Sequence, residues 1–236
     1  MLCCAALLGA AHGAAANTLN AVNAPSRPAV VELFTSEGCS SCPPAEIYLG
    51  ELARRRDVLA LAFHVDYWDD LGWRDRFGLP EAAQRQRAYA RDLGLAAIYT
   101  PQAVIDGQES FVGGDRRPIA KALERQRSGA AVALSVRDGE VWVDLAEQAH
   151  IPPSDVLLIT YQRSAISTIR RGENAGRTLV EFNIVRSLHT LGRWTGEQRH
   201  YRWPASSSPR ETTDVAIIVQ PLAHAPIIGA ATIALR

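Results

Sequence analysis

The chain has 236 residues, of which 47% are hydrophobic, and its 25 basic residues balance 25 acidic ones. This length and composition supply enough apolar side chains for one large domain or two small ones. The scattered arginines form no basic stripe of the kind that nucleic-acid-binding proteins carry, so we expect no nucleic-acid partner. Beyond the N-terminal segment, no run of about 20 apolar residues predicts stable membrane insertion.

The chain begins with MLCCAALLGAAHGAAANTLNA, which is apolar and rich in alanine. This segment is too short to span a bilayer permanently. Small residues at 14–16 offer a cleavage site, so residues 1–16 are predicted to be a signal peptide, although no Lys or Arg precedes the apolar run. Cleavage would leave Cys39 and Cys42 as the cysteines of a secreted or periplasmic protein, in an oxidising compartment.

Residues 17–28 are predicted to form a polar linker, and residues 29–128 a domain of alternating strands and helices. Prolines mark one helix start, where missing N–H groups cost least, and Asp106-Gly107 is a strong hairpin signal. The predicted order is a strand at 29–34, a helix at 43–56, a strand at 58–65, a helix at 81–95, two short strands within 99–113 and a helix at 115–128.

After Ser128 the pattern changes to strands separated by turn residues, with a second hairpin signal at Asp138-Gly139. We therefore expect residues 129–236 to form an all-β, sandwich-like accessory domain whose loops approach the helix-mouth end of the first domain. Strands are predicted within 131–146 and at 155–162, 177–188, 213–220 and 226–235. The segment 172–178, GENAGRT, is either a tight polar turn or a contact loop toward the first domain.

The stretch FTSEGCSSCPPAE places Cys39 and Cys42 between a buried strand and a helix. Backbone N–H groups and the helix dipole at that point stabilise a thiolate, which lowers the pKa of a cysteine below about 8.5. This spacing predicts that Cys39 attacks a partner's disulfide and that Cys42 resolves the mixed disulfide. Ser40 and Ser41 between them are candidate substrate contacts, and Cys39 is expected to be the more exposed cysteine.

Four blocks of the sequence, VELFTSEGCSSCPPAE, HVDYWDDLGW, YTPQAVIDG and GENAGRTL, occur in order along the chain. Together they resemble a family of secreted, thioredoxin-like bacterial proteins catalogued as a domain of unknown function. The resemblance implies an α/β thioredoxin-like N-terminal domain and export, but it implies no substrate. The chain departs from thioredoxin itself, because Gly38 replaces an aromatic residue and Ser40-Ser41 replaces Gly-Pro.

The same resemblance suggests roles for Thr100, Pro101 and Glu32. Thioredoxin-like folds carry a cis proline facing the cysteine pair, so Thr100-Pro101 is predicted to be cis and to expose the backbone of Thr100 to a bound peptide. Glu32 lies near where thioredoxin buries an acid. It is either a buried proton relay for Cys42 or a strand-edge residue in water.

Residues 64–75, HVDYWDDLGWRD, should lie near the top of the sheet and form a substrate groove with aromatic walls and an acidic rim. The alternatives are that the aromatic residues only cover the sheet edge and that His64 is a structural, hydrogen-bonded residue. The candidate substrate-binding residues in this segment are His64, Asp66, Tyr67, Trp68 and Trp73.

These observations predict an exported thiol–disulfide oxidoreductase that acts on protein or small-molecule thiols and disulfides and requires no dissociable cofactor. One alternative is a metal-handling protein that binds copper through Cys39, Cys42 and His64, since thiolates and imidazole suit that metal. A second alternative is a non-enzymatic binding module with an inert disulfide.

Overall fold

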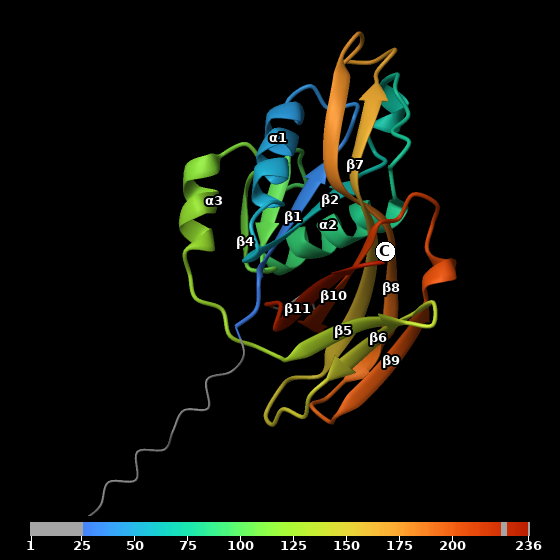
Figure 1. Cartoon of the computed structure of the whole chain (residues 1–236). Coiled ribbons are helices and arrows are strands. Elements are labelled where there is room, and N and C mark those ends of the chain that lie inside the picture. Colours follow the sequence, from blue (N-terminus) through green and yellow to red (C-terminus); the bar gives the residue numbers. More distant parts are fainter. Residues whose placement is uncertain (1–25, 223–225, 236) are drawn as a thin grey trace, which may run out of the picture.

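The computed structural model describes residues 26–222 and 226–235 (Figure 1), so the predicted signal peptide and most of the predicted linker lie outside the described residues. The helices are α1 (Pro43–Leu52), α2 (Pro80–Asp92) and α3 (Arg116–Leu123), with 3-10 turns η1 (Asp69–Leu71) and η2 (Ala205–Ser207). The strands are β1 (Ala29–Thr35), β2 (Val58–His64), β3 (Gln102–Ile105), β4 (Glu109–Val112), β5 (Val132–Arg137), β6 (Glu140–Leu145), β7 (Ser154–Thr168), β8 (Thr178–Trp194), β9 (Arg199–Pro204), β10 (Asp214–Pro221) and β11 (Gly229–Ala234).

Local sequence signals account for most of these boundaries. Pro43 and Pro44 occupy the first helical positions of α1, where their missing N–H groups cost no hydrogen bond. Asp106 and Gly107 both have positive φ, at 51° and 69°, which is the backbone twist that a β-hairpin turn needs, and with Gln108 they connect β3 and β4. Asp138 and Gly139 also both have positive φ and form the two-residue turn between β5 and β6.

One mixed sheet of eight strands dominates the fold, in the order β11-β10-β7-β8-β2-β1-β3-β4. β2 runs parallel to both β1 and β8, and the other neighbours are antiparallel. A second sheet contains β5, β6 and β9. The seam between β2 and β8 is a short one, in which Ala62 pairs with Ile184 and the Asn183 side chain donates to the carbonyl of Ala60 at 2.8 Å.

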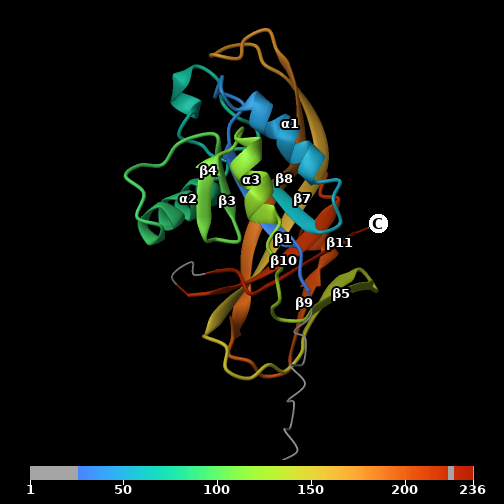
Figure 2. The same ribbon diagram turned by 90° about the vertical axis from the view of Figure 1, so that its left-hand side faces the viewer.

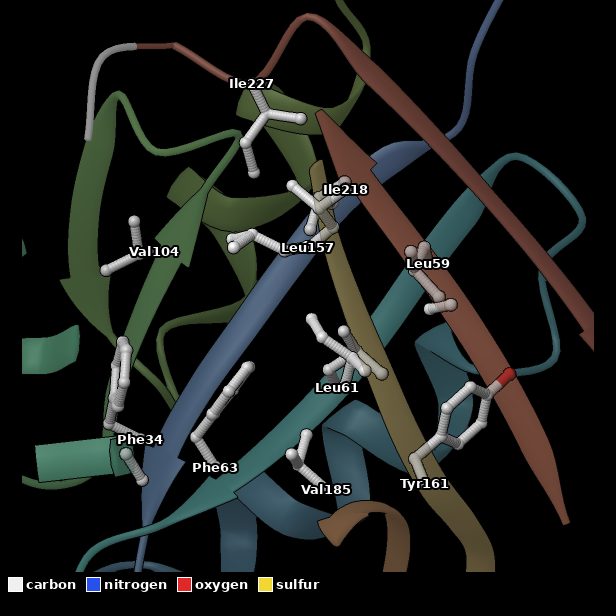
Figure 3. Close-up of a cluster of buried hydrophobic side chains, with 14 of the residues drawn as sticks. Phe34, Leu59, Leu61, Phe63, Val104, Leu157, Tyr161, Val185, Ile218 and Ile227 are labelled. Atoms are coloured by element: carbon white, nitrogen blue, oxygen red, sulfur yellow. The ribbon is translucent and has the colours of Figure 1, made fainter. Parts of the chain in front are cut away.

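Three apolar clusters hold the layers together. On one face of the large sheet, a cluster that includes Phe34 and Phe63 continues across β7 and β10 and packs against α2 (Figure 3). On the opposite face, α1 and α3 cover β1, β2 and β3. The small sheet covers the rest of that face, and Trp194 is fully buried between the two sheets. In the part of the chain that the structure describes, no helix is long and apolar enough to cross a membrane.

The predicted fold class is wrong. The chain is mostly β, with three helices among its described residues, and the strands after Ser128 do not form a separate sandwich. Instead, β7, β8, β10 and β11 extend the sheet that β1 to β4 begin, because β8 hydrogen-bonds to the open edge of β2. The expected order of strands and helices up to residue 128 is present, but it is part of this larger sheet and not a thioredoxin-like domain of its own.

The β7–β8 hairpin is the longest element and reaches from the small sheet to the end of the molecule at which α1 begins (Figure 2). It packs closely on α1, since a Cβ atom placed at Gly50 would lie 2.5 Å from the Phe182 ring. Its tip reaches the loop between β1 and α1, as predicted for a loop of the second half of the chain, since the Asn174 side chain donates to the carbonyl of Cys39.

Candidate active site

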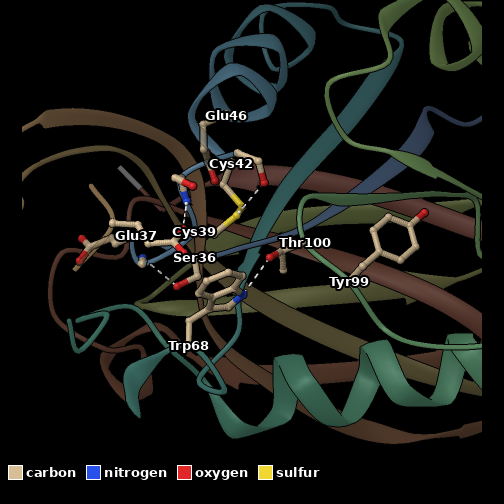
Figure 4. The surroundings of a disulfide bond; sticks show 12 residues. Ser36, Glu37, Cys39, Cys42, Glu46, Trp68, Tyr99 and Thr100 are labelled. Atoms are coloured by element: carbon tan, nitrogen blue, oxygen red, sulfur yellow. Dashed lines mark hydrogen bonds between the residues drawn. A yellow bond between two sulfur atoms is a disulfide. The ribbon is translucent and has the colours of Figure 1, made fainter. Parts of the chain in front are cut away.

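The loop between β1 and α1 carries a disulfide between Cys39 and Cys42 (Figure 4). The two Cα atoms are 5.4 Å apart, and the backbone N–H of Cys42 donates to the carbonyl of Cys39 at 3.2 Å. Cys42 is the N-cap residue of α1, and Cys39 Sγ lies 3.3 Å from the hydroxyl of Ser41. A thiolate released here would have a hydroxyl and a helix N-terminus nearby to stabilise its charge.

Both cysteines are buried, with 0% of Cys39 and 1% of Cys42 exposed. The prediction that Cys39 is the more exposed is therefore wrong. The loop is covered from outside, because Trp68 packs beside Gly38, at 3.3 Å from where a Cβ would stand. Ser40 and Ser41, the two candidate substrate contacts, remain exposed.

The peptide bond between Thr100 and Pro101 is cis, as predicted. The indole N–H of Trp68 donates to the hydroxyl of Thr100 at 2.9 Å, and Figure 4 shows both side chains beside the disulfide. Pro101 itself is buried and packs next to Gly113. Two of the predicted site segments are thus brought together with the cysteine loop.

The tip of the β7–β8 hairpin closes over the cysteine loop. Asn174 is fully buried, and its side-chain amide donates to the carbonyls of Glu37 and Cys39, each at 2.9 Å. The carboxylate of Glu173 accepts a hydrogen bond from the backbone N–H of Ser40 at 3.1 Å. The segment 172–178 is therefore a contact loop as well as a turn, and Asn174 is a site residue that the sequence analysis did not identify.

The remaining candidates from the segment after β2 have different surroundings. Trp73 donates to a carboxylate oxygen of Glu37 at 2.6 Å and so lies beside the cysteine loop. Tyr67 donates to Gln86 of α2 at 3.1 Å, and Asp66 is half-buried. Neither Tyr67 nor Asp66 is among the described residues that line the cavity beside the disulfide.

This cavity has a volume of about 420 Å³, which is within the usual range for small-molecule sites. Cys42 lines it, but Cys39 does not. Its polar wall includes Glu46 from α1, His64 at the end of β2 and Glu181 from β8. The cavity therefore brings one cysteine of the disulfide together with ionisable groups from three elements.

His64 is the buried cation of this site. Its Nδ1 atom is 2.8 Å from Asp75 Oδ2, and its Nε2 atom is 3.9 Å from Glu46 Oε1. Burial by itself would lower the pKa of His64, but the carboxylates of Asp75, Glu46 and Glu181 raise it to about 10. In return, His64 holds the pKa of Asp75 below its ordinary value, against the effect of burial.

Two carboxyl groups face the cavity with pKa values above their ordinary range. Burial raises the pKa of Glu46, and the neighbouring His64 opposes this only in part. Burial likewise raises the pKa of Glu181 to about 8, with the carboxylates of Glu37 and Glu46 adding to the effect of burial. Glu181 can therefore exchange a proton near neutral pH, which is the property that general acid–base catalysis uses, and the pKa of Glu46 is shifted in the same direction.

Several buried polar atoms of the cavity have no hydrogen-bond partner of ordinary geometry among the described residues. Native proteins pair almost all such atoms, so a group of them in one place indicates a site that binds a ligand or water. They are Thr35 Oγ1, Glu37 Oε1, both carboxylate oxygens of Glu46 and His64 Nε2.

Glu32 is buried, which excludes the alternative of a strand-edge residue in water. It lies on the other face of the sheet from α1, however, where both of its oxygens are bonded to Arg85 of α2. The hydroxyl of Tyr89 also donates to it at 2.7 Å. The acid that stands near Cys42 is instead Glu46, one helical turn further along α1.

The copper alternative has no support from the arrangement of donor atoms. In the described part of the chain, no group of three His, Cys, Asp or Glu side chains could hold a metal ion. His64 directs one ring nitrogen to Asp75, and both sulfur atoms of the proposed set belong to the disulfide.

The fold and the site define a class of mixed-sheet, mostly β proteins with a Cys-Ser-Ser-Cys disulfide at the start of a helix, closed by a long hairpin. The chain belongs to a protein family of unknown function, DUF1223, whose sequence pattern matches residues 30–220. Membership in a family catalogued as a domain of unknown function is thereby confirmed.

Among solved structures, the chain is similar to a crystal structure of a protein from Agrobacterium tumefaciens. The two share 29% sequence identity with a TM-score of 0.78, over 90% of this chain and 96% of the other. A search of curated proteins finds no match.

Proposed function

We propose that this protein is an exported thiol–disulfide oxidoreductase whose reactive group is the Cys39–Cys42 pair. The observation that carries the proposal is the position of Cys42 on the wall of a cavity that also holds Glu46 and His64. Such a site offers a disulfide, space for a substrate and groups that exchange protons. Its substrates are thiols or disulfides, and small ones fit the cavity best.

A purely structural role explains this disulfide poorly. It joins residues separated by three positions, and closing so short a loop removes little entropy from the unfolded chain. The carbonyl of Cys39 is also fixed independently by Asn174. The stability of the loop thus has other sources, which favours a chemical role for the two sulfur atoms.

The reaction consists of two exchange steps. A substrate thiolate attacks the sulfur of Cys42, which forms a mixed disulfide and releases Cys39 as a thiolate. A second substrate thiolate then attacks the substrate sulfur of the mixed disulfide, which forms the substrate disulfide and releases Cys42 as a thiolate. Two electrons pass from the substrate thiols to the protein, and the opposite direction oxidises the protein.

The structure changes the role that we give to each cysteine. The sequence pattern favours attack by Cys39, but Cys42 is the cysteine that lines the cavity. Cys39 has the Ser41 hydroxyl beside its sulfur, which suits a leaving thiolate. We assign to Glu46 the exchange of a proton with the substrate thiol or with Cys42, since burial raises its pKa toward the working range of a general base.

The test combines single-cysteine variants with a small disulfide reagent. The purified protein should first reach a redox equilibrium with glutathione, measured from the fraction of free thiols. Cys39→Ser should then form a mixed disulfide with 2-hydroxyethyl disulfide faster than Cys42→Ser, as followed by mass spectrometry. Faster trapping by Cys42→Ser would return the attacking role to Cys39.

Glu46→Gln tests the proton transfer. Replacing Glu46 should slow the exchange at pH 7 by roughly 100-fold, which is typical for loss of a general acid–base group. A disulfide that no thiol reduces in the folded wild-type protein would contradict the proposed function and support the inert alternative.

A further inference from the structure

The cavity beside Cys42 carries more acidic than basic groups. His64 is a single buried cation that three carboxyl groups face, namely Asp75, Glu46 and Glu181. Asp75 is within 2.8 Å of it and neutralises it directly. Because Asp75 already neutralises this cation, no further cation among the described residues of the cavity balances Glu46 and Glu181.

The other nearby cations do not reach these two carboxyl groups. Arg177 stands at the cavity wall and donates to the side-chain carbonyl of Asn174 at 3.0 Å. Arg76 is half-exposed and lies 3.8 Å from Glu37. A positively charged ligand would thus supply the cation for Glu46 and Glu181 that the described residues around the cavity do not provide.

Glu181 is placed to hold such a group. It is 1% exposed, and one of its oxygens accepts a hydrogen bond from the Ser167 hydroxyl at 3.0 Å. Its other oxygen accepts no hydrogen bond from the described residues, so it is free to bind a ligand. The cavity wall that Glu181 and Cys42 share also has apolar groups, which suit a short hydrocarbon chain, and these belong to Pro43, Ile47, Leu179 and Val180.

We propose that the cavity selects small aminothiols and their disulfides, with the ammonium group of the substrate bound by Glu181 and its sulfur directed to Cys42. Glu46, on α1, handles the thiol proton, while Glu181, on β8, holds the cation. This assignment rests on the proposed exchange function and adds its substrate class. An ammonium group also needs hydrogen-bond acceptors, which the unpartnered oxygens of the cavity provide.

The test compares three thiols that differ in charge and that each have two methylene groups between the sulfur and the polar group. Cysteamine is cationic, 2-mercaptoethanol is neutral and 3-mercaptopropionate is anionic. For each thiol, the rate of reduction of the protein disulfide is measured and divided by its rate of reduction of a small model disulfide. This ratio removes the difference in intrinsic reactivity between the thiols. We expect a preference of at least about tenfold for cysteamine over 3-mercaptopropionate, as for other charge-assisted hydrogen bonds.

Glu181→Gln should reduce this preference to near unity, and Glu181→Asp should restore part of it. The matched control is Glu51→Gln, which removes one carboxylate from the exposed part of α1 and should leave the preference unchanged. Circular dichroism and urea unfolding of each variant establish that it is folded.

A second measurement separates this inference from the proposed function. Calorimetry of the disulfide-bonded protein should detect binding of propylammonium, which Glu181→Gln weakens, and no binding of propionate. Thiol exchange without a preference for cysteamine would overturn the inference and leave the proposed function standing. Propylammonium binding without any thiol exchange would overturn the proposed function and leave only the cation site at Glu181, and failure of both measurements would overturn both.

Discussion

Two buried groups of charged side chains lie on opposite faces of the large sheet, and they differ in how completely they are paired. On the α2 face, Glu32 and Arg85 pair through two hydrogen bonds, and Arg85 also donates to Tyr89 and Gln220. On the α1 face, His64 is bonded to Asp75 and lies 3.9 Å from Glu46, whose two oxygens have no hydrogen-bond partner of ordinary geometry among the described residues. Burial of charge therefore does not by itself mark a functional site.

The first prediction breaks the closed group. Arg85→Met should leave the Glu32 carboxylate buried without its guanidinium, which should lower the free energy of unfolding by about 3–5 kcal/mol. The double variant Glu32→Leu/Arg85→Met should recover most of this loss, because no unpaired charge remains. Urea unfolding at pH 7 measures both.

The open group supplies the contrast. Glu46→Gln should change the free energy of unfolding by less than about 1 kcal/mol, because the amide has nearly the same shape and the Glu46 oxygens have no hydrogen bonds to lose. If Arg85→Met cost no more than Glu46→Gln, the distinction between a closed structural pair and an open site would fail.

The second prediction concerns pH. Glu181 has a pKa of about 8 in the folded protein, raised from an ordinary value of 4.5, so the folded state binds the proton more tightly than the unfolded state. Stability should therefore fall as pH rises from about 4.5 to 8. The pKa of His64, raised from 6.5 to about 10, contributes stability below pH 6.5 that is lost between 6.5 and 10.

In Glu181→Gln, the free energy of unfolding should fall less between pH 5 and 8, by roughly 2–4 kcal/mol over this range. The loss of stability that His64 causes up to about pH 10 should remain. Urea unfolding at several pH values measures the slope. Glu51→Gln is the control, because the pKa of Glu51 is lowered and this group titrates below the window. A variant slope equal to that of the wild type would contradict the role of Glu181.

The third and smallest prediction concerns the hairpin that covers the disulfide. Asn174→Ala should remove the hydrogen bonds to the carbonyls of Glu37 and Cys39 and lower the free energy of unfolding by about 1–2 kcal/mol. Reduction of the disulfide by 2-mercaptoethanol should become faster, because the loop is less firmly held. Glu173→Gln, whose side chain is exposed, should change neither quantity measurably.

The sequence contained enough information for most local structure. Hairpin turns at Asp106-Gly107 and Asp138-Gly139 and the proline start of α1 follow from residue chemistry at short range, whereas the cis bond before Pro101 followed from the resemblance to thioredoxin-like folds. β9 was missed because its residues, RHYRWP, are mostly polar and arginine-rich and give no apolar run. The joining of both halves into one sheet was not predictable either, since the β2–β8 pairing depends on a register between residues about 120 positions apart.

The residues of the site also fall into those that could be predicted from local sequence and those that depend on long-range pairing. Cys39, Cys42, Trp68 and Thr100 could be assigned from sequence, and Glu46 was within reach, because it follows Cys42 by one helical turn. Glu181 and Asn174 could not be assigned, because the local sequence does not indicate that β8 forms a wall of the cavity or that the tip of the hairpin covers the cysteine loop. Glu32 was predicted as the acid of the site because it lies near where thioredoxin buries an acid, and the sequence of a buried strand does not reveal which face of the sheet each residue occupies.

The short seam between β2 and β8 has a consequence for synthesis of the chain. When residues up to about 128 have emerged from the ribosome, β2 still lacks its neighbour and presents an apolar, unpaired edge. That edge is covered, and Asn174 reaches the cysteine loop, only after the hairpin that ends at Trp194 has been made. A nascent or truncated chain thus carries the cysteine loop without the hydrogen bonds of Asn174, and that cover belongs to the finished protein.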